Sequence, residues 1–391
     1  MRILYHHRTA SKDGQVVHIK ELIDALRRRG HELVIIGPTF GRNEKFGGES
    51  RTITYLKQHL PKAFYELLEL SYSIVAYFSL ERAYRIHDPD IIYERYNLYL
   101  LAGCWLHRRH RLPYFLEVNA PLYEERASYD GIALKHIAKW TQHTAWRAAD
   151  RVLPVTYVLA DQIEAAGVPE ERITVIPNGI NIQRFLLPAR QNTIKKHLGL
   201  ADKFVLGFTG FIREWHGLDT VVELIAAEDK LNLHLLIVGE GPGRVALAAH
   251  AQRLGVTDQL TFTGVVDHET IADYILSFDI ALQPSVTSYA SPLKLFEYMA
   301  LGRPVVAPKS PNIEEILTDG ENAILFPPED KILFRAAIQR LCVDRELREK
   351  IGGAARRLID ERRLTWDYNA ERLERMFEQA LAATARSRTK R

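Results

Sequence analysis

Short apolar runs alternate with amphipathic stretches along most of the chain. The runs have the length of β-strands, and the stretches between them place apolar residues at helical spacing, as Leu22, Ala25 and Leu26 do. This alternation is typical of parallel sheets covered by helices, so we predict an α/β fold. The expected strands are residues 2–7, 32–38, 90–95, 114–119, 151–156 and 174–178, then 204–210, 234–241, 260–264, 280–284, 304–308 and 323–327.

The strand and helix pattern occurs twice, with a break where turn residues and polar helix starts collect. The break lies at residues 180–200, which we interpret as a linker. A length of 391 residues is enough for two full cores. We therefore predict two doubly wound, Rossmann-like domains, residues 1–184 and 185–365, with ligands bound in loops at the carboxyl ends of the strands.

The net charge and the cysteine content argue against several classes of partner and site. The net charge is only +3 and basic residues are mostly interleaved with acids, which argues against nucleic acid as a partner. The acid-free end, residues 386–391, is predicted to be a disordered basic tail. Cys104 and Cys342 lie far apart in apolar or mixed surroundings, so we expect core thiols and no disulfide or metal site.

The longest apolar region, residues 64–86, leaves two interpretations open. Glu66, Glu69 and Glu81 interrupt it, so it does not form a membrane span. It fits either a buried amphipathic helix pair or a helix lying on a membrane surface. The first residues resemble a strand and not a signal peptide. We expect a cytoplasmic protein, with peripheral contact at the inner face of the membrane as an open alternative.

Loops after several expected strands carry candidate site residues. Gly14 permits close backbone approach before a helix, and His18 lies one turn further along it, although each signal alone is weak. Arg213 and His216 follow a strand of the second half, and a glycine-rich loop around Gly241 follows the next strand. Because parallel strands end at one edge, these second-half loops should meet there.

A short helix after these loops has clear boundaries. Ser291 is expected as its N-cap, Pro292 as its first residue and Gly302 as the left-handed residue after its end. Lys294 and Glu297 lie three residues apart on this apolar helix. Alone, they fit a surface ion pair worth about 0.2–0.5 kcal/mol or part of a ligand site.

The combination of these residues favours the ligand site. A helix N-terminus and Lys294 attract phosphate, Arg213 can make a forked contact with phosphate oxygens, and Glu297 is placed for ribose hydroxyls. Such a site suits a nucleoside diphosphate. It holds no carboxylate cluster for a magnesium ion, so we expect no metal and no cofactor.

The ordered motifs at residues 13–31, 175–181, 208–217, 237–244, 262–266 and 291–307 resemble the retaining glycosyltransferases of family 4. The resemblance covers nearly the whole chain. It implies the GT-B architecture, in which two Rossmann-like domains face each other across a cleft. It also implies that a C-terminal helix at residues 366–385 packs back on the N-terminal domain.

The resemblance implies a role for individual residues. Arg213 matches the arginine that stabilises the leaving diphosphate, and Glu297 matches the second glutamate of the family's E-x7-E pattern, which binds ribose. The implied catalytic set is Arg213, His216, Lys294 and Asn119, and the implied donor-binding set is Gly14, Gly241, Val265, Ser291, Pro292, Leu293 and Glu297. The acceptor-side candidates are His18, Glu117 and Arg95.

The chain departs from the family pattern at several positions. Asp13 replaces the first glycine of the usual pair, and Tyr289 replaces the first glutamate of E-x7-E. Asn119 aligns with a histidine of many relatives, and His216 stands where lysine is usual. A neutral His216 can still donate a hydrogen bond, but its full charge requires a pH near or below about 6.5 unless phosphate raises its pKa.

The implied activity is transfer of a sugar, with retention, from a nucleotide-sugar donor to a hydroxyl acceptor. By analogy the acceptor is a glycan or lipid-linked glycan of polysaccharide biosynthesis, which the basic residues Arg108, Arg109 and Arg111 and the apolar region fit. A nucleotide-sugar epimerase and a non-catalytic sugar-nucleotide-binding partner remain alternatives.

Overall fold

The computed structural model describes residues 1–9, 14–38, 59–185, 193–228 and 230–389. These residues form two compact units. The first consists of Met1–Pro177, Tyr289–Ser291 and Trp366–Arg391, and the second of Asn178–Ser288 and Pro292–Thr365. The first stretch of the chain thus leaves the first unit at Pro177, before the predicted boundary at residue 184.

The first unit contains a parallel sheet of five strands in the order β2-β1-β3-β4-β5. The predicted sixth strand at residues 174–178 is absent from the sheet. Ile173 forms a single bridge with Val152, and the chain then reaches Pro177, which has no N–H to continue a ladder. The elements are β1 Arg2–His6, α1 Gly14–Arg28, β2 Glu32–Ile36, α3 Lys62–His87, β3 Ile91–Arg95, α4 Ala102–His110, β4 Tyr114–Val118, α5 Leu122–Tyr129, α6 Lys135–Ala148, β5 Arg151–Pro154, α7 Tyr157–Ala165, a 3₁₀ turn Glu170–Arg172 and α17 Trp366–Thr389.

Alternate strand residues of the first sheet supply two apolar faces, as the period of a strand requires. Leu4, Ile92 and Leu116 pack into a core with residues of α3, α4, α6 and α7. On the other face, the rings of Tyr5 and Tyr93 stack at 5.2 Å, and the edge of Phe377 from α17 meets Phe115 at 4.7 Å. Burial on both faces explains why these strands read as nearly continuous apolar runs.

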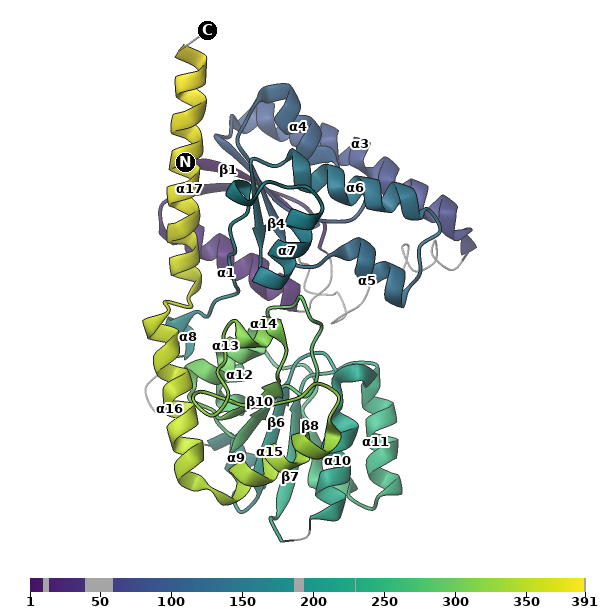
Figure 1. Cartoon of the computed structure of the whole chain (residues 1–391), viewed down its shortest axis with the longest axis vertical. Helices are drawn as coiled ribbons and strands as arrows, with labels where there is room; N and C mark the ends of the chain where they lie inside the picture. The colour runs from purple at the N-terminus through teal and green to yellow at the C-terminus, as the bar shows by residue number, and fades with distance from the viewer. Residues whose placement is uncertain (10–13, 39–58, 186–192, 229, 390–391) are drawn as a thin grey trace. The chain divides into compact units, whose positions relative to one another are not determined.

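Helix α17 belongs to the first unit and lies beside α1 (Figure 1). Its apolar side carries Trp366, Ala370, Leu373 and Phe377, all of which are buried. The helix continues to Thr389. The prediction of a disordered tail at residues 386–391 is therefore wrong for residues 386–389. Residues 390–391 lie outside the described residues.

The second unit contains a parallel sheet of six strands in the order β11-β10-β9-β6-β7-β8. All six predicted strands of the second half are present. The elements are α8 Ile182–Phe185, α9 Thr193–His197, β6 Phe204–Thr209, a 3₁₀ turn Glu214–His216, α10 Leu218–Ala227, β7 Leu233–Val238, α11 Gly243–Arg253, a 3₁₀ turn Thr257–Gln259, β8 Leu260–Phe262, α12 Ile271–Ile275, β9 Ile280–Leu282, α13 Leu293–Ala300, β10 Val305–Pro308, α14 Pro311–Glu314, β11 Ile324–Phe326, α15 Lys331–Val343 and α16 Arg345–Glu361.

The second sheet also has an apolar core on each face. Leu206 and Ile237 pack with α10, α11 and α15, whereas Val205 and Leu236 pack with α12, α13 and α16. Phe185 is part of the second core, so α8 belongs to the second unit and is not a free linker. The α/β class and the doubly wound form of both units are confirmed.

The two cysteines are free and buried, as predicted. Burial raises the pKa of both the Cys104 and the Cys342 thiol to about 12. Both therefore remain protonated near neutral pH and act as small apolar residues. Among the described residues, no helix is both long and apolar enough to cross a membrane.

Candidate functional site

The loops at the carboxyl ends of β6, β7 and β8 are linked to one another by backbone contacts. The N–H groups of Gly210 and Ile212 donate to the carbonyls of Val238 and Glu240, at 2.9 and 3.0 Å. Gly239 and Gly264 form a further bridge. These contacts bring the loops of three strands to one edge of the second unit, as predicted.

Two close backbone approaches in these loops require glycine. A Cβ at Gly239 would lie 2.0 Å from the carbonyl oxygen of Gly210, and a Cβ at Gly241 would lie 2.3 Å from that of Ile212. Real Cβ atoms do not approach a backbone oxygen so closely, so larger residues would separate the loops. Gly241 thus has a packing role that holds whether or not it contacts a ligand.

Lys294 extends from the first turn of α13 into this group of loops. Its Nζ lies 3.7 Å from the ring centroid of Phe208 and 3.5 Å from the position of a Cβ on Gly210. Burial lowers the pKa of Lys294 to about 7, and the negative charge of Glu297 opposes this shift only in part. An anion bound next to Lys294 would therefore stabilise its charged, ammonium form.

His216 is neutral at ordinary pH. Burial, followed by the charges of Lys294 and Arg213, lowers its pKa to about 3. The expectation that it titrates near 6.5 is therefore wrong for the protein alone. The backbone N–H of Arg213 donates to Nδ1 of His216 at 3.1 Å, which leaves the proton of the neutral ring on Nε2. His216 can therefore offer a hydrogen bond without carrying charge.

Arg213 is exposed and follows β6 in the same loop. Its guanidinium carbon lies 5.1 Å from the ring centroid of Phe211. Tyr298 joins this loop to α13, because its hydroxyl accepts from the Thr209 N–H at 2.9 Å. Arg213, His216 and Lys294 are thus gathered at the end of β6.

Glu297 lies one turn after Lys294 in α13 and is only 7% exposed. Because Glu297 is buried, the interpretation of Lys294 and Glu297 as a surface ion pair is excluded. His268 places Nε2 at 3.7 Å from Oε1 of Glu297, and Arg184 contacts Nδ1 of the same ring. Arg184 and His268 were not predicted, because neither belongs to a motif and only the fold brings them near Glu297.

The start of α13 differs from the prediction by one position. Pro292 and not Ser291 is the N-cap, and the helix begins at Leu293 without a side-chain cap among the described residues. Gly302 adopts the predicted left-handed conformation, with φ of 62°. Val265, after β8, is 53% exposed at the same edge of the sheet.

Two residues of the predicted donor-binding set, Gly14 and Ser291, lie outside the second unit. Ser291 belongs to the first unit, as does Gly14, which is the first residue of α1. Asp13 lies outside the described residues. Tyr289, at the first glutamate position, is also in the first unit, where its carbonyl oxygen accepts from Oγ1 of Thr156 at 2.9 Å.

The predicted acceptor-side residues form one cluster around Glu117 at the end of β4. Oε1 of Glu117 accepts from Nδ2 of Asn119 at 2.6 Å and lies 3.1 Å from Nε2 of His18. Nη1 of Arg95 donates to the same oxygen, and the Tyr93 hydroxyl donates to Oε2 at 2.8 Å. Sequence reasoning named four of these residues separately, missed Tyr93 and did not predict the cluster.

The electrostatics of this cluster keep Glu117 ionised. Burial alone would raise the pKa of the carboxyl group, but His18, Arg95 and Asn119 hold the pKa of Glu117 well below its usual range. His18 also meets the edge of Trp366 from α17, with 4.8 Å between ring centroids. Glu117 thus holds the polar side chains of three segments in fixed positions.

No group of three or more histidine, cysteine or carboxylate side chains is arranged for a metal ion in the part of the chain that the structure describes. The charged side chains that act on His216 at the end of β6 are instead those of Lys294 and Arg213. These two cations and the first N–H groups of α13 form an arrangement suited to an anion with several oxygens.

Comparison with protein families gives two matches that together cover most of the chain. Residues 12–184 match the model described as Glycosyltransferase Family 4, and residues 190–358 match Glycosyl transferases group 1. The division between the two matches falls close to the division between the two compact units.

Curated relatives match with moderate identity. The chain is 28% identical to the alpha-D-kanosaminyltransferase of Streptomyces kanamyceticus over 55% of this chain and 57% of that protein. It is 24% identical to the GDP-mannose-dependent alpha-mannosyltransferase of Mycolicibacterium smegmatis over 94% of each. A D-inositol 3-phosphate glycosyltransferase of Geodermatophilus obscurus is matched over 47% of its length, so some of these alignments span only about half of the relative.

Solved structures share the fold over nearly the whole chain. Sucrose-phosphate synthase from Thermosynechococcus elongatus has a TM-score of 0.76 at 19% identity and covers 98% of this chain and 100% of its own. Anabaena HepE in complex with UDP-glucose has a TM-score of 0.73 at 20% identity, with 97% and 100% covered. At these identities the likeness shows the fold alone.

Proposed function

We propose that this chain, which belongs to the family 4 glycosyltransferases with the GT-B fold, transfers a sugar from a nucleoside-diphosphate sugar to a hydroxyl acceptor. The observation that carries the proposal is the grouping of Arg213, His216 and Lys294 at the carboxyl end of β6, beside the start of α13. Two cations and a neutral hydrogen-bond donor are what a leaving diphosphate requires.

The chemistry follows from charge that develops as the bond to the sugar breaks. The leaving diphosphate gains negative charge on its oxygens, which Lys294 and Arg213 stabilise with little reorganisation because their positions are already set. Nε2–H of His216 donates a hydrogen bond to the same group. Glu297, which lies beside His268 and through it near Arg184, accepts hydrogen bonds from ribose hydroxyls.

Retention at the anomeric carbon is part of the proposal and rests on the family. No protein carboxylate needs to act as the nucleophile, because the acceptor hydroxyl attacks from the face that the diphosphate leaves and the departing phosphate takes its proton. Glu117 is in any case engaged by Arg95, His18 and Asn119. We assign these first-unit residues to the acceptor side. A glycan or lipid-linked glycan of polysaccharide biosynthesis is the acceptor that we propose, and no metal ion is needed for catalysis.

Binding of uridine, guanosine and adenosine mono- and diphosphates, measured by calorimetry, tests the donor site. Arg213→Ala should weaken binding of the preferred diphosphate about 10- to 100-fold, since hydrogen bonds to charged groups contribute roughly 1.5–3 kcal/mol, and should affect the monophosphate less. Glu297→Ala should weaken both nucleotides to a similar extent, because it acts on the ribose.

Arg340→Ala, which removes an exposed arginine of α15 in the same unit, is the matched control and should bind as the wild type does. Absence of binding of any nucleotide to folded protein would contradict the proposal. With the donor identified, turnover of its sugar with and without added acceptor separates a transferase from an epimerase.

An exposed apolar stripe on α3 supports our proposal of peripheral contact with a membrane surface. Phe64, Val75 and Phe78 are 53%, 61% and 64% exposed, and helical spacing places them on one face with the exposed Arg82. The full set of exposed apolar residues on the helix is Phe64, Leu67, Leu68, Ile74, Val75, Phe78 and Ile86. An apolar stripe with a cationic end fits an anionic lipid surface.

Flotation with phosphatidylcholine vesicles that contain phosphatidylglycerol tests this contact. The double change Val75→Glu and Phe78→Glu should reduce the vesicle-bound fraction roughly tenfold or more, because it places two charges where apolar side chains would enter the lipid. Val245→Glu, on a 78% exposed valine of α11 in the second unit, should change nothing. Failure of the wild type to float with these vesicles would remove the membrane contact.

A further inference from the structure

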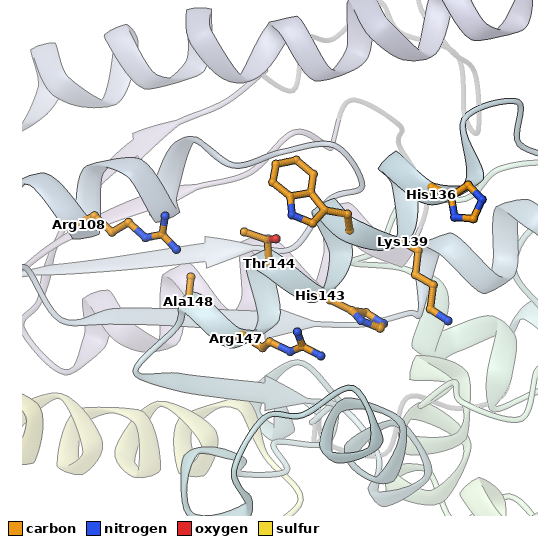
Figure 2. A pocket seen from close by; sticks show the side chains of 8 residues that line it. Arg108, His136, Lys139, His143, Thr144, Arg147 and Ala148 are labelled. Atoms are coloured by element: carbon orange, nitrogen blue, oxygen red, sulfur yellow. The ribbon is translucent and has the colours of Figure 1, made fainter.

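The first unit has a cavity of about 360 Å³ that shares no residue with the Glu117 cluster. Eight residues line it, one from α4 and the others from α6 (Figure 2). The lining contains the cations Arg108, Lys139 and Arg147 and no acidic residue. The proposed chemistry at the donor site uses none of these side chains, although Arg108 is one of the basic residues that the sequence associates with a lipid-linked acceptor.

The spacing of the lining residues follows one face of α6. Positions 136, 139, 140, 143, 144 and 147 follow the helical pattern i, i+3, i+4, i+7, i+8 and i+11, which places their side chains along a single face. From the first to the last, this face extends over roughly 16 Å at 1.5 Å per residue. Trp140 stands in the middle of it and is 57% exposed.

No acidic side chain of the described residues pairs with the positive charge in the cavity. Among the described residues, Arg108, Lys139 and Arg147 form no ion pair. Arg147 is held in place because its Nε donates to the carbonyl oxygen of Ala166 at 2.7 Å. Burial, and then the charges of Arg147 and Lys139, lower the pKa of His143 in the lining, and Glu124 from α5 opposes them only in part.

A solvated basic helix face would explain the charges but not the other features. The residues line a concavity and not a convex surface, one arginine is oriented by the backbone, and a large aromatic ring is left in water beside them. An arginine can hold two phosphate oxygens in a fork, a lysine adds a point charge and a threonine hydroxyl can donate. Together these groups match a phosphate group.

We propose that the cavity between α4 and α6 binds the phosphate group of a phosphate-bearing ligand, on Arg108, Lys139 and Arg147 with Thr144 as a further donor. Trp140 contacts the apolar or ring part of the same molecule. The phosphate can belong to a soluble molecule or to a lipid headgroup, because the chemistry of recognition is the same. The site is independent of the proposed donor site, which lies in the second unit.

The imidazole of His143 provides a probe within the cavity itself. In NMR titrations with inorganic pyrophosphate, we expect saturable shifts of the His143 ring signals and a rise in its pKa, because an anion stabilises the imidazolium form. The double variant Arg108→Glu and Lys139→Glu should weaken this binding roughly tenfold or more. Both residues are exposed, so folding should be little affected.

The matched control changes the same net charge at exposed positions of the first unit outside the cavity, as Lys135→Glu with Arg172→Glu, and should titrate as the wild type does. Flotation with vesicles containing phosphatidylglycerol is the second arm. Vesicle binding that is lost in the cavity variant but retained in its control identifies a lipid headgroup, whereas pyrophosphate binding alone identifies a soluble ligand. The proposal is overturned if the cavity variant and its control behave alike in both arms.

Discussion

Replacing Lys294 with methionine is expected to abolish most of the donor-site function while making the protein more stable. Loss of one preorganised group that stabilises the leaving charge typically reduces kcat about 100-fold or more. Without its ligand, however, the folded protein must keep this side chain in a place that lowers its pKa to about 7. The methionine side chain fills similar space without that cost.

The pH dependence of stability follows from the sign of this shift. The pKa of Lys294 is about 7 in the folded protein and 10.5 as its ordinary value, so the unfolded chain binds more protons between these limits. The contribution of Lys294 to stability therefore rises with pH from about 7 to 10.5 and is most unfavourable below 7. At pH 6, Lys294→Met should melt at a higher temperature than the wild type.

Binding of the donor should depend on pH in the opposite direction to stability. A nucleoside-diphosphate sugar, whose phosphates do not titrate near neutral pH, should bind the wild type more weakly as the pH rises above about 7, because the free site loses its ammonium charge. Binding to Lys294→Met should be weak and nearly independent of pH. Calorimetry and thermal melting from pH 6 to 9 measure both effects.

Lys350→Met, at an exposed lysine of α16 in the same unit, provides the matched control. It should leave donor binding, its pH dependence and the melting temperature close to those of the wild type. If Lys294→Met binds the donor with wild-type affinity, Lys294 lies outside the donor site and its buried position has another cause.

Glu117→Gln should destabilise the first unit more than any surface change. The substitution removes the charge that Arg95 and His18 share in a buried position. Breaking a buried ion pair from one side typically costs about 3–5 kcal/mol, because the remaining charge loses its partner. For a unit of this size, that corresponds to a lower melting temperature by roughly 6 to 20 °C.

Two further variants test whether the unpaired charge causes the loss of stability in Glu117→Gln. Adding Arg95→Met to Glu117→Gln should recover part of the lost stability, because the unpaired guanidinium is removed as well. Glu32→Gln, whose partner Arg2 is on the surface, should change stability by less than about 1 kcal/mol. Scanning calorimetry measures all three. Equal melting temperatures for Glu117→Gln and Glu32→Gln would contradict the assigned role of Glu117.

The contribution of Glu117 to the stability of the fold also depends on pH. Because the pKa of Glu117 is depressed in the folded protein, its stabilising contribution is present above the ordinary carboxyl pKa and is lost as the pH falls through the folded value. The folded pKa lies well below the usual range. The stability of the wild type relative to Glu117→Gln should therefore stay constant from neutral pH to mild acid.

Local sequence was sufficient for much of the architecture. The six strands of the second sheet and the left-handed Gly302 follow from short-range rules, namely apolar runs and the conformational freedom of glycine. The same rules failed at residues 174–178, where apolar composition suggested a strand. Pro177 removes the N–H that a ladder needs, and the sheet ends at β5.

Motifs placed most site residues near the correct strand ends, but they did not indicate how these residues interact. His18, Arg95 and Asn119 come from three separate segments and meet at Glu117 only because β1, β3 and β4 are neighbours in the sheet. His268 reaches Glu297, and Arg184 reaches His268, because the fold brings α8 and the loop after β8 close to α13. No spacing in the sequence encodes such contacts.

The sequence by itself determined the strand and helix pattern, the family and the residue types at the strand ends, because these depend on side-chain chemistry and on neighbours along the chain. Only the tertiary structure decided the charge states of His216 and Lys294, which share one crowded strand end with Arg213. A pKa depends on the surroundings that folding creates, namely the loss of water and the charges brought close from distant segments.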